Sequence, residues 1–373
     1  MEQAVRERIV EARQTLHELA ELPGEESRTR ACIRDFLRRH TTLTVIDRGS
    51  WLYARHDEGA ETTTVVRADH DAVPTPEGPR HLCGHDGHTA ALLGLALLLE
   101  GRTLGQNVIL LFQPAEETGA GGALCCGLFA LEGLRPENAR IIGCHNIPGG
   151  PLGTLLFRHG TFACASCGVE LLLHGSPAHA AYPENGVNPS AAAARLALRL
   201  PALARELAAE RGCMCLATVV GLRSGERAFG VAASEAALWA TLRAERPEAF
   251  EALNRGVDLA VREIAAAEGL RYELRRLDVF PATVNDEALQ AELERRCRAR
   301  GLPWRNLEQP FRWSEDFGHY GRFLPACFFG VGAGGDTPPL HTEGYVYPDE
   351  LAPRTAELLL ALLAPGGEAG NRG

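Results

Sequence analysis

The chain has 373 residues, of which 45% are hydrophobic and 23% are charged, and its formal net charge is −10 at pH 7. This length predicts two domains or one large one, and the composition is that of an ordinary globular protein. The negative charge argues against a nucleic-acid-binding protein, because no basic stripe is available to neutralise phosphates.

All 38 basic residues are arginine. The absence of lysine excludes Schiff-base, pyridoxal-phosphate and P-loop lysines. Eleven cysteines occur in a chain that is neither small nor visibly secreted, so we expect most of them to be reduced thiols.

The N-terminal 22 residues predict a charged amphipathic helix and not a signal peptide, because they lack an apolar segment. The longest apolar run, residues 90–99, is too short to span a bilayer. We therefore expect a cytoplasmic protein with no membrane partner.

Strand-like and helix-like segments alternate over the first 160 residues. Short aliphatic or β-branched runs predict strands over residues 62–69, 107–115 and 139–147. Helices are expected between them, over roughly 88–101 and 121–132. Near-continuous apolar strands that alternate with helices predict an α/β fold with a mostly parallel sheet and helices on both of its faces.

The pattern changes after about residue 165. The next elements are predicted as strands over 167–175, 213–222, 230–245 and 270–280, with long helices over 188–212 and 247–269. The order strand-helix-strand-strand-helix-strand matches the split βαβ, ferredoxin-like α+β sandwich. From Pro281 onward, strand-like and helix-like segments alternate again as in the first 160 residues. We therefore expect one domain formed by residues 1–165 and 281–373, with a second domain, residues 166–280, inserted into it.

Metal-competent side chains recur where the predicted strands end. They are Asp69, His70 and Asp71 after the first strand, Cys83 and His85 in the loop that follows, Glu116 and Glu117 after the second strand, His145 in the third, and His341 after an apolar run over 326–333. The ligand crevice of an open α/β sheet lies at the carboxyl ends of its strands, so several of these side chains are expected to converge there.

Thiolate, imidazole and carboxylate are the ligands of Zn²⁺ and related ions. Gly84 permits the tight turn that places Cys83 and His85 together. In the Glu116–Glu117 pair one carboxylate can hold a metal while the other acts as general base. Taken singly, each feature has a plainer interpretation: a hydrogen-bonded loop histidine, a solvated glutamate pair, or a Cys83 thiol nucleophile with a histidine base. The recurrence of such residues at strand ends favours a hydrolytic metal centre.

Six segments in this order carry a resemblance to a known family: RADHDAVP, CGHDGHTAALLG, FQPAEETGAGGA, GCHNIPGGPLGT, HGSPAHAAYPENGVNP and SEDFGHY. They closely resemble the amidohydrolase branch of the metal-dependent aminoacylase and carboxypeptidase family. That branch includes hippurate hydrolases, N-acyl-amino-acid amidohydrolases, N-acetyl-diaminopimelate deacetylases and auxin-conjugate hydrolases. The match extends over nearly the whole chain.

The resemblance implies a centre of two divalent metal ions per chain, with zinc or manganese expected first and cobalt or nickel also suited to such a site. The implied ligands are Cys83, His85, Glu117, His145 and His341. Glu116 falls at the general-base position of the family. Asp71 falls where the family has an aspartate that supports the metal ligands.

The resemblance also implies that the inserted domain is a lid and dimerisation domain, which makes a homodimer the expected assembly. His179 matches the lid histidine that stabilises the oxyanion, often in the active site of the partner subunit. Arg243, or Arg223, is a candidate for binding a substrate carboxylate. Asn188 is a further candidate substrate-binding residue.

The sequence departs from the family pattern in three places. His70 replaces a methionine and adds an imidazole near the expected metals. The lid segment over residues 230–234 reads GVAAS where a polar group is usual, and the segment from His341 reads HTEGY. The last two departures bear on substrate preference.

These features predict a metal-dependent hydrolase that cleaves the amide bond of N-acyl amino acids or short peptides. A dipeptidase or carboxypeptidase-like enzyme of the same family is the nearest alternative. A non-catalytic metal-binding relative and a Cys83 thiol hydrolase are the alternatives from other classes.

Overall fold

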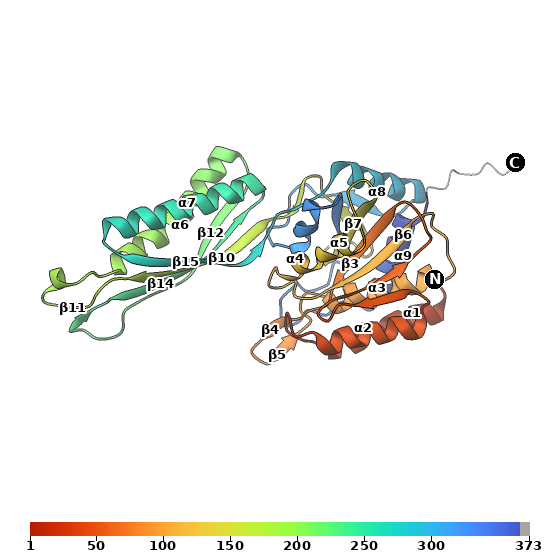
Figure 1. Cartoon of the computed structure of the whole chain (residues 1–373), viewed down its shortest axis with the longest axis horizontal. Helices are drawn as coiled ribbons and strands as arrows, with labels where there is room; N and C mark the ends of the chain where they lie inside the picture. The colour runs from red at the N-terminus through yellow and green to blue at the C-terminus, as the bar shows by residue number, and fades with distance from the viewer. Residues whose placement is uncertain (366–373) are drawn as a thin grey trace. The chain divides into compact units, whose positions relative to one another are not determined.

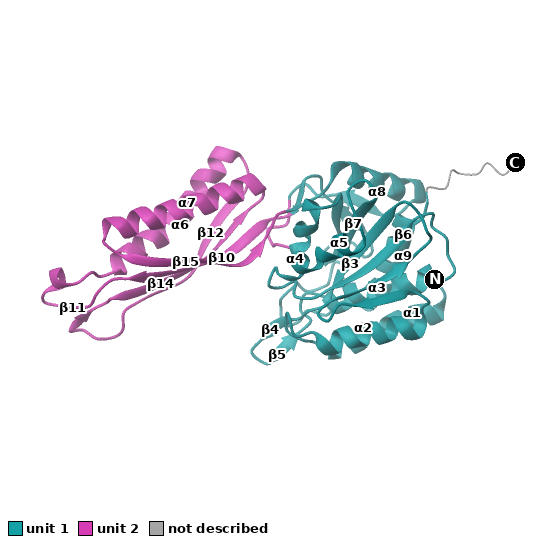
Figure 2. Ribbon diagram, in the orientation of Figure 1, with its two compact units in different colours: residues 1–162, 283–309, 316–373 teal, residues 163–282, 310–315 magenta. Residues whose placement is uncertain are grey.

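The computed structural model describes residues 1–365 and divides into two compact units (Figure 2). Within the described residues, unit 1 comprises 1–162, 283–309 and 316–365, and unit 2 comprises 163–282 and 310–315. The sequence assigned residues 310–315 to the resumed first domain. They belong instead to unit 2, because the backbone N–H of Cys164 donates to the carbonyl oxygens of Phe311 and Trp313.

Unit 1 is built on an eight-stranded sheet in the order β1-β2-β6-β3-β7-β18-β8-β17 (Figure 1). Its strands are β1 (Thr44–Asp47), β2 (Leu52–His56), β3 (Thr63–Asp69), β6 (Asn107–Gln113), β7 (Ala139–Ile147), β8 (Leu155–Phe157), β17 (Trp304–Asn306) and β18 (Ala326–Gly332). The central strands β6, β3, β7 and β18 pair in parallel, and antiparallel pairs occur toward both edges. The predicted mostly parallel sheet is confirmed.

The helices of unit 1 are α1 (Gln3–Glu18), α2 (Ser27–His40), α3 (His85–Leu99), α4 (Gly121–Cys125), α5 (Gly127–Leu131), α8 (Glu287–Arg300) and α9 (Leu351–Leu363), with the 3-10 helix η2 (Asp316–Arg322). Short strands complete the unit: β4 (Val73–Thr75), β5 (Gly78–Arg80) and β16 (Thr283–Val284). Strand β9 (Thr161–Ala163) crosses the boundary, because its last residue is the first of unit 2.

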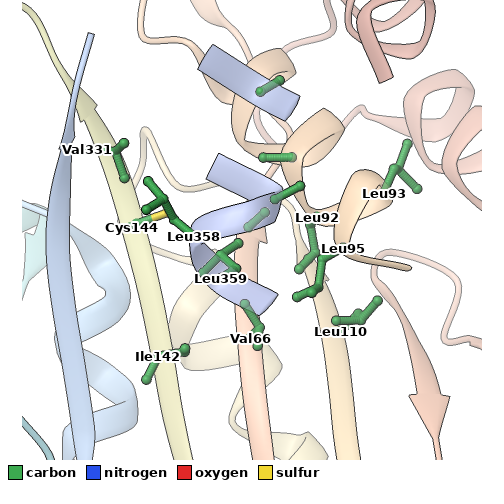
Figure 3. Packing of buried hydrophobic residues seen from close by; sticks show 14 of the residues in the cluster. Val66, Leu92, Leu93, Leu95, Leu110, Ile142, Cys144, Val331, Leu358 and Leu359 are labelled. Carbon is green, nitrogen blue, oxygen red and sulfur yellow. The ribbon is translucent and has the colours of Figure 1, made fainter. Parts of the chain in front are cut away.

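Both faces of the sheet are buried. Val66, Leu110 and Ile142 point into a core that they share with α3 and α9 (Figure 3). Successive side chains of a strand point to opposite faces, so the neighbouring residues form a second buried layer. In that layer the rings of Phe317 in η2 and Phe328 in β18 lie 4.8 Å apart. Parallel strands covered on both faces explain the continuous apolar runs in the sequence.

Helix α3 begins at His85, three residues before the start expected from the sequence. Gly84 precedes it in the left-handed conformation, with φ 94°. A Cβ atom at Gly84 would lie 2.6 Å from Asn146 Oδ1 and 2.6 Å from the Tyr345 hydroxyl. Only glycine fits this turn, so the helix starts directly after it.

The helical stretch predicted over roughly 121–132 is confirmed, but it is divided into two helices. The stretch forms α4 and α5, two helices of five residues each that meet at Cys126.

Unit 2 contains a four-stranded antiparallel sheet in the order β12-β14-β10-β15. Its elements are β10 (Ala165–His174), β11 (Ala178–His179), η1 (Pro183–Asn185), α6 (Ser190–Arg211), β12 (Cys215–Ser224), β13 (Val231–Ala232), β14 (Glu235–Ala244), α7 (Pro247–Ala267) and β15 (Arg271–Phe280). The predicted ferredoxin-like order is confirmed, although the strand expected over 230–245 divides into β13 and β14. Alternate residues of the sheet, such as Leu171 and Leu238, share a separate core with α6 and α7.

Within residues 1–365, no helix combines the length and the apolar character that crossing a membrane requires.

Gly94 sets how closely α3 packs against its neighbours. A Cβ atom there would lie 2.7 Å from Ile9 Cδ1 and 2.9 Å from Ala356 Cβ. We expect Gly94→Ala to lower the free energy of unfolding by about 1–3 kcal/mol, because the added methyl overpacks the core. Urea denaturation measures this change.

The control is Gly127→Ala in α5, where an added Cβ would meet no described atom within 4 Å. It is expected to leave stability unchanged or to raise it slightly. Equal stability of Gly94→Ala and the wild type would contradict the packing account.

Candidate metal centre

The centre forms where neighbouring parallel strands of unit 1 end. The loop after β3 carries Asp71, the loop after β6 carries Glu116 and Glu117, and β7 contains His145 near its carboxyl end. Since β6, β3 and β7 lie side by side, their carboxyl ends meet at one edge of the sheet.

Four sets of three side chains that include Cys83 or His85 bring their ligand atoms within 4.8 Å of one another. The sets are Cys83–His85–His145, Cys83–Glu117–His341, His85–Glu116–Glu117 and Asp69–His85–His88. The first three contain all five ligands that the family resemblance implied, together with the implied general base.

Three atom pairs give the spacing within these sets. The sulfur of Cys83 lies 3.3 Å from His145 Nε2. Oε1 of Glu117 lies 3.5 Å from His341 Nε2 and 3.8 Å from His85 Nε2.

Hydrogen bonds to the backbone and to carboxylates orient the two buried imidazoles. His145 Nδ1 lies 2.8 Å from the carbonyl oxygen of Asn146, which can only accept, so Nδ1 carries the proton and Nε2 presents its lone pair toward Cys83. His85 Nδ1 lies 3.0 Å from Asp71 Oδ1, and Nε2 therefore faces the other ligands. A carboxylate behind an imidazole is the usual support of a metal-binding histidine.

Two polar atoms at the centre of the cluster lack a hydrogen-bond partner among residues 1–365. They are His85 Nε2 and Glu117 Oε1, both buried. Buried polar atoms are almost always paired, because an unpaired one costs about 1–3 kcal/mol. A divalent cation between them would satisfy both atoms, and the sulfur, nitrogen and oxygen donors match the ligands of zinc and related ions. The residues present therefore fit a metal ion.

Asp71 connects two parts of the cluster. One carboxylate oxygen contacts His85, and the other accepts a 2.9 Å hydrogen bond from the backbone N–H of Glu117. Asp71 is completely buried. It thus fixes both the ring of one candidate ligand and the backbone of another.

Strained backbone occurs at two positions of the centre. Ala115, directly before the glutamate pair, has φ 50°, and His341 has φ 60°. Non-glycine residues in this region cost of order 1–3 kcal/mol and cluster at functional sites. The backbone N–H of His341 donates to the carbonyl of Leu82, which ties its loop to the one that carries Cys83.

Burial and nearby charges set the protonation of the cluster. Burial lowers the pKa of His145 well below its ordinary value, so this imidazole is neutral. Burial raises the pKa of the Cys83 thiol. Burial alone would lower the pKa of His85, but the charge of Asp69 and the hydrogen bond to Asp71 raise it well above its ordinary value.

His70 is the imidazole that the sequence adds near the expected metals, where the family pattern has a methionine. It belongs to none of the ligand sets found within residues 1–365, and neither ring nitrogen has a hydrogen-bond partner there. Burial lowers the pKa of His70 to about 4, so the ring is neutral at physiological pH.

The remaining predicted site residues lie in unit 2. His179 is exposed on β11, and its Nδ1 accepts a 3.0 Å hydrogen bond from the backbone N–H of Ala181. Asn188 Oδ1 accepts from the backbone N–H and hydroxyl of Ser190, the first residue of α6, which gives it a structural role at that helix start.

Arg243, also in unit 2, donates from Nη1 to the carbonyl oxygen of Arg312 and the hydroxyl of Ser314, each at 3.1 Å. Burial lowers the pKa of its guanidinium. The alternative residue, Arg223, is exposed and forms an ion pair with Glu226.

A buried ion cluster beneath the centre was missed by the sequence analysis. Arg67 is completely buried and contacts Asp69 and Asp316, each at 2.7 Å. Asp69 in turn lies 2.6 Å from His88 Nδ1, while the backbone N–H of Asp316 donates to Glu116 Oε1 at 3.3 Å. The signal in the sequence was an arginine within an otherwise apolar buried strand.

The profile of peptidase family M20/M25/M40 matches residues 65–364. The chain belongs to this family. It is a metal-dependent hydrolytic enzyme that acts on amide bonds, and the resemblance to the amidohydrolase branch is confirmed.

Individual relatives agree with this assignment. The chain is 28% identical to an N-acetylcysteine deacetylase of Bacillus subtilis (strain 168), with 94% of each chain covered. It is 31% identical to the IAA-amino acid hydrolase ILR1-like 5 of Arabidopsis thaliana, over 80% of this chain and 72% of the relative. A Bacillus subtilis structure described as a dinuclear metal-binding M20 peptidase shares the fold, with a TM-score of 0.80 and 24% identity over 97% of this chain and 98% of the other.

We expect Arg67→Met to lower the free energy of unfolding by about 3–5 kcal/mol, because it leaves two buried carboxylates without their cation. The matched control is Arg140→Met, which removes a partly exposed pair with Glu292 and is expected to cost at most about 1 kcal/mol. Urea denaturation of both variants tests the difference, and equal losses would show that the buried cluster has no special role.

Proposed function

We propose that the protein hydrolyses the amide bond of small N-acyl amino acids, with two divalent metal ions and Glu116 as general base. The observation that carries this proposal is the overlap of the ligand sets, in which buried, unpartnered atoms of His85 and Glu117 face each other. Relatives named as N-acetylcysteine deacetylase, N-acetyldiaminopimelate deacetylase and IAA-amino acid hydrolase support the substrate class.

Cys83 supports two metal positions rather than one. Its sulfur belongs to one set with His85 and His145 and to another with Glu117 and His341. Cys83, with the histidines and Glu117 of these sets, would hold the ions. Zinc fits the thiolate best, manganese is the next candidate, and cobalt or nickel also suit this mixed donor set.

Metal binding would release protons from the site. The pKa of His85 and the pKa of Cys83 are both raised, and each must lose its proton to offer a lone pair or a thiolate. His145 is already neutral. Affinity for the ions is therefore expected to rise with pH.

Glu116 is positioned as a base. Its Oε1 accepts from the backbone N–H of Asp316, while Oε2 lies 4.0 Å from His85 Nε2 at the ligand cluster. The ions, when bound, supply Lewis acidity to the scissile carbonyl and lower the pKa of the attacking water. Glu116 then takes the proton of that water and passes it to the departing amine.

Unit 2 is proposed to act as the lid and dimerisation domain. The hydrogen bond that His179 Nδ1 accepts leaves the ring proton on Nε2, which makes Nε2 a donor suited to a developing oxyanion. We propose that this donor serves an active site of a homodimer. Arg243, whose Nη1 donates to neutral oxygens, is proposed to bind the substrate carboxylate. Asn188, in the lid motif over residues 174–189, is proposed as a further substrate-binding residue.

Two other functions use the same residues. A dipeptidase would employ the same centre on a peptide bond. A Cys83 thiol hydrolase is disfavoured because burial raises the pKa of the thiol and its sulfur lies within two ligand sets.

The paired variants Glu116→Gln and Glu117→Gln separate base from ligand. We expect Glu116→Gln to keep the wild-type metal content while kcat falls by about 10²–10⁴, because only proton transfer is lost. Glu117→Gln is expected to lose metal as well as activity. Mass spectrometry of metal content and an amide hydrolysis assay measure both, and wild-type kcat in Glu116→Gln would refute the assignment of the base.

A substrate panel tests the reaction itself. We expect turnover of N-acetyl amino acids in preference to dipeptides, loss of activity on chelation, and recovery when Zn²⁺ or Mn²⁺ is restored. Iodoacetamide is expected to leave the metal-loaded enzyme active. Preference for dipeptides would favour the peptidase, whereas indifference to chelators with inactivation by alkylation would favour the thiol hydrolase.

A further inference from the structure

A hydrogen bond from a distant part of the chain supports the turn that carries Glu116 and Glu117. Ala115 adopts φ 50°, a conformation that an alanine rarely takes without support. This residue follows β6 by two positions and precedes Glu116, so its conformation sets the direction in which the two glutamate side chains leave the backbone. Something must fix that conformation.

The support comes from the N-terminal part of the chain. Oε1 of Glu26 accepts a 2.8 Å hydrogen bond from the backbone N–H of Ala115, which lies 89 residues away in the sequence. The same oxygen accepts a 2.8 Å bond from the backbone N–H of Gly24. The side chain is thus directed at the turn.

Glu26 directs its side chain at the turn and not at the helix that it precedes. It occupies the N-cap of α2, yet its side chain makes no capping hydrogen bond within that fully described helix. Capping falls instead to Glu21, which accepts from the backbone N–H groups of Arg28 and Thr29. Glu26 therefore does not cap α2, although a residue at the N-cap position normally does so.

Glu26 is only 5% exposed, and burying a carboxylate is costly unless its bonds repay the loss of water. A neutral residue could fill the same space without that penalty. Together with Asp71, which binds the backbone N–H of Glu117, Glu26 holds the backbone on both sides of Glu116. Glu26 also lies before residue 65, where the family match begins.

We propose that Glu26 is a positioning residue that fixes the turn over residues 115–117 and thereby aims Glu116 and Glu117 into the metal centre. This inference rests on the proposed roles of those two glutamates. Glu26 itself touches neither the candidate metal ligands nor the reacting atoms.

The test compares Glu26→Ala and Glu26→Gln with the control Glu21→Gln. Glu21 is a similarly buried carboxylate of the same segment, and its bonds order α2 and not the turn. Its backbone carbonyl accepts from Ala72, and a side-chain substitution keeps that bond. The measurements are thermal stability, kcat and KM for an N-acetyl amino acid at saturating metal, and the affinity for Zn²⁺ by competition with a chromogenic chelator.

We expect Glu26→Ala to lower kcat at least tenfold with KM changed less than threefold, and to weaken Zn²⁺ binding at least tenfold. Glu26→Gln keeps a carbonyl acceptor and should recover part of both losses. Glu21→Gln should lower the melting temperature with kcat and Zn²⁺ affinity within about twofold of the wild type. If Glu26→Ala does not fold, Glu26→Gln against Glu21→Gln gives the same comparison.

The proposal is overturned if the Glu26 variants match Glu21→Gln in both kcat and Zn²⁺ affinity, because Glu26 would then serve stability alone. Failure of the proposed function looks different. In that case the wild type itself hydrolyses no N-acetyl amino acid, while the Zn²⁺ affinities of the variants still decide whether Glu26 positions the turn.

Discussion

The carboxylate of Asp71 joins the loops from which the metal centre is built. One oxygen orients the ring of His85, and the other holds the backbone N–H of Glu117. This arrangement depends on the parallel pairing of β3 with β6, which brings the ends of the two strands together. Burial would raise the pKa of Asp71, but the hydrogen bond to His85 lowers it, so the side chain remains a charged acceptor. The pairing of β3 with β6 therefore determines which side chains meet in the metal centre.

Much of this arrangement could be predicted from the sequence. Continuous apolar runs indicated strands buried on both faces, and polar residues at their ends indicated where ligands meet. The strand over residues 139–147 has the predicted bounds. The ferredoxin-like order of unit 2 followed from its alternation of long helices and strands. These inferences succeeded because they rest on local periodicity and on the rule that parallel strands share one carboxyl edge.

Contacts between distant parts of the chain could not be predicted in the same way. The ion pair between Arg67 and Asp316 joins residues 249 positions apart, and no local pattern shows it. The hydrogen bond from the backbone N–H of Ala115 to Glu26 likewise joins residues far apart in the sequence, 89 positions in this case. The start of α3 at His85 was missed because it depends on how closely Asn146 and Tyr345 approach Gly84, a tertiary constraint. His70 adds an imidazole directly before Asp71, but its ring lies outside the ligand sets found within residues 1–365.

The central claim is that two divalent ions lie among these side chains. Anomalous diffraction from crystals of the zinc-loaded protein, recorded at the zinc absorption edge, tests it most directly. The account predicts two peaks, one beside Cys83 and His145 and one beside Glu117 and His341. A single peak, no peak, or peaks away from these residues would contradict it.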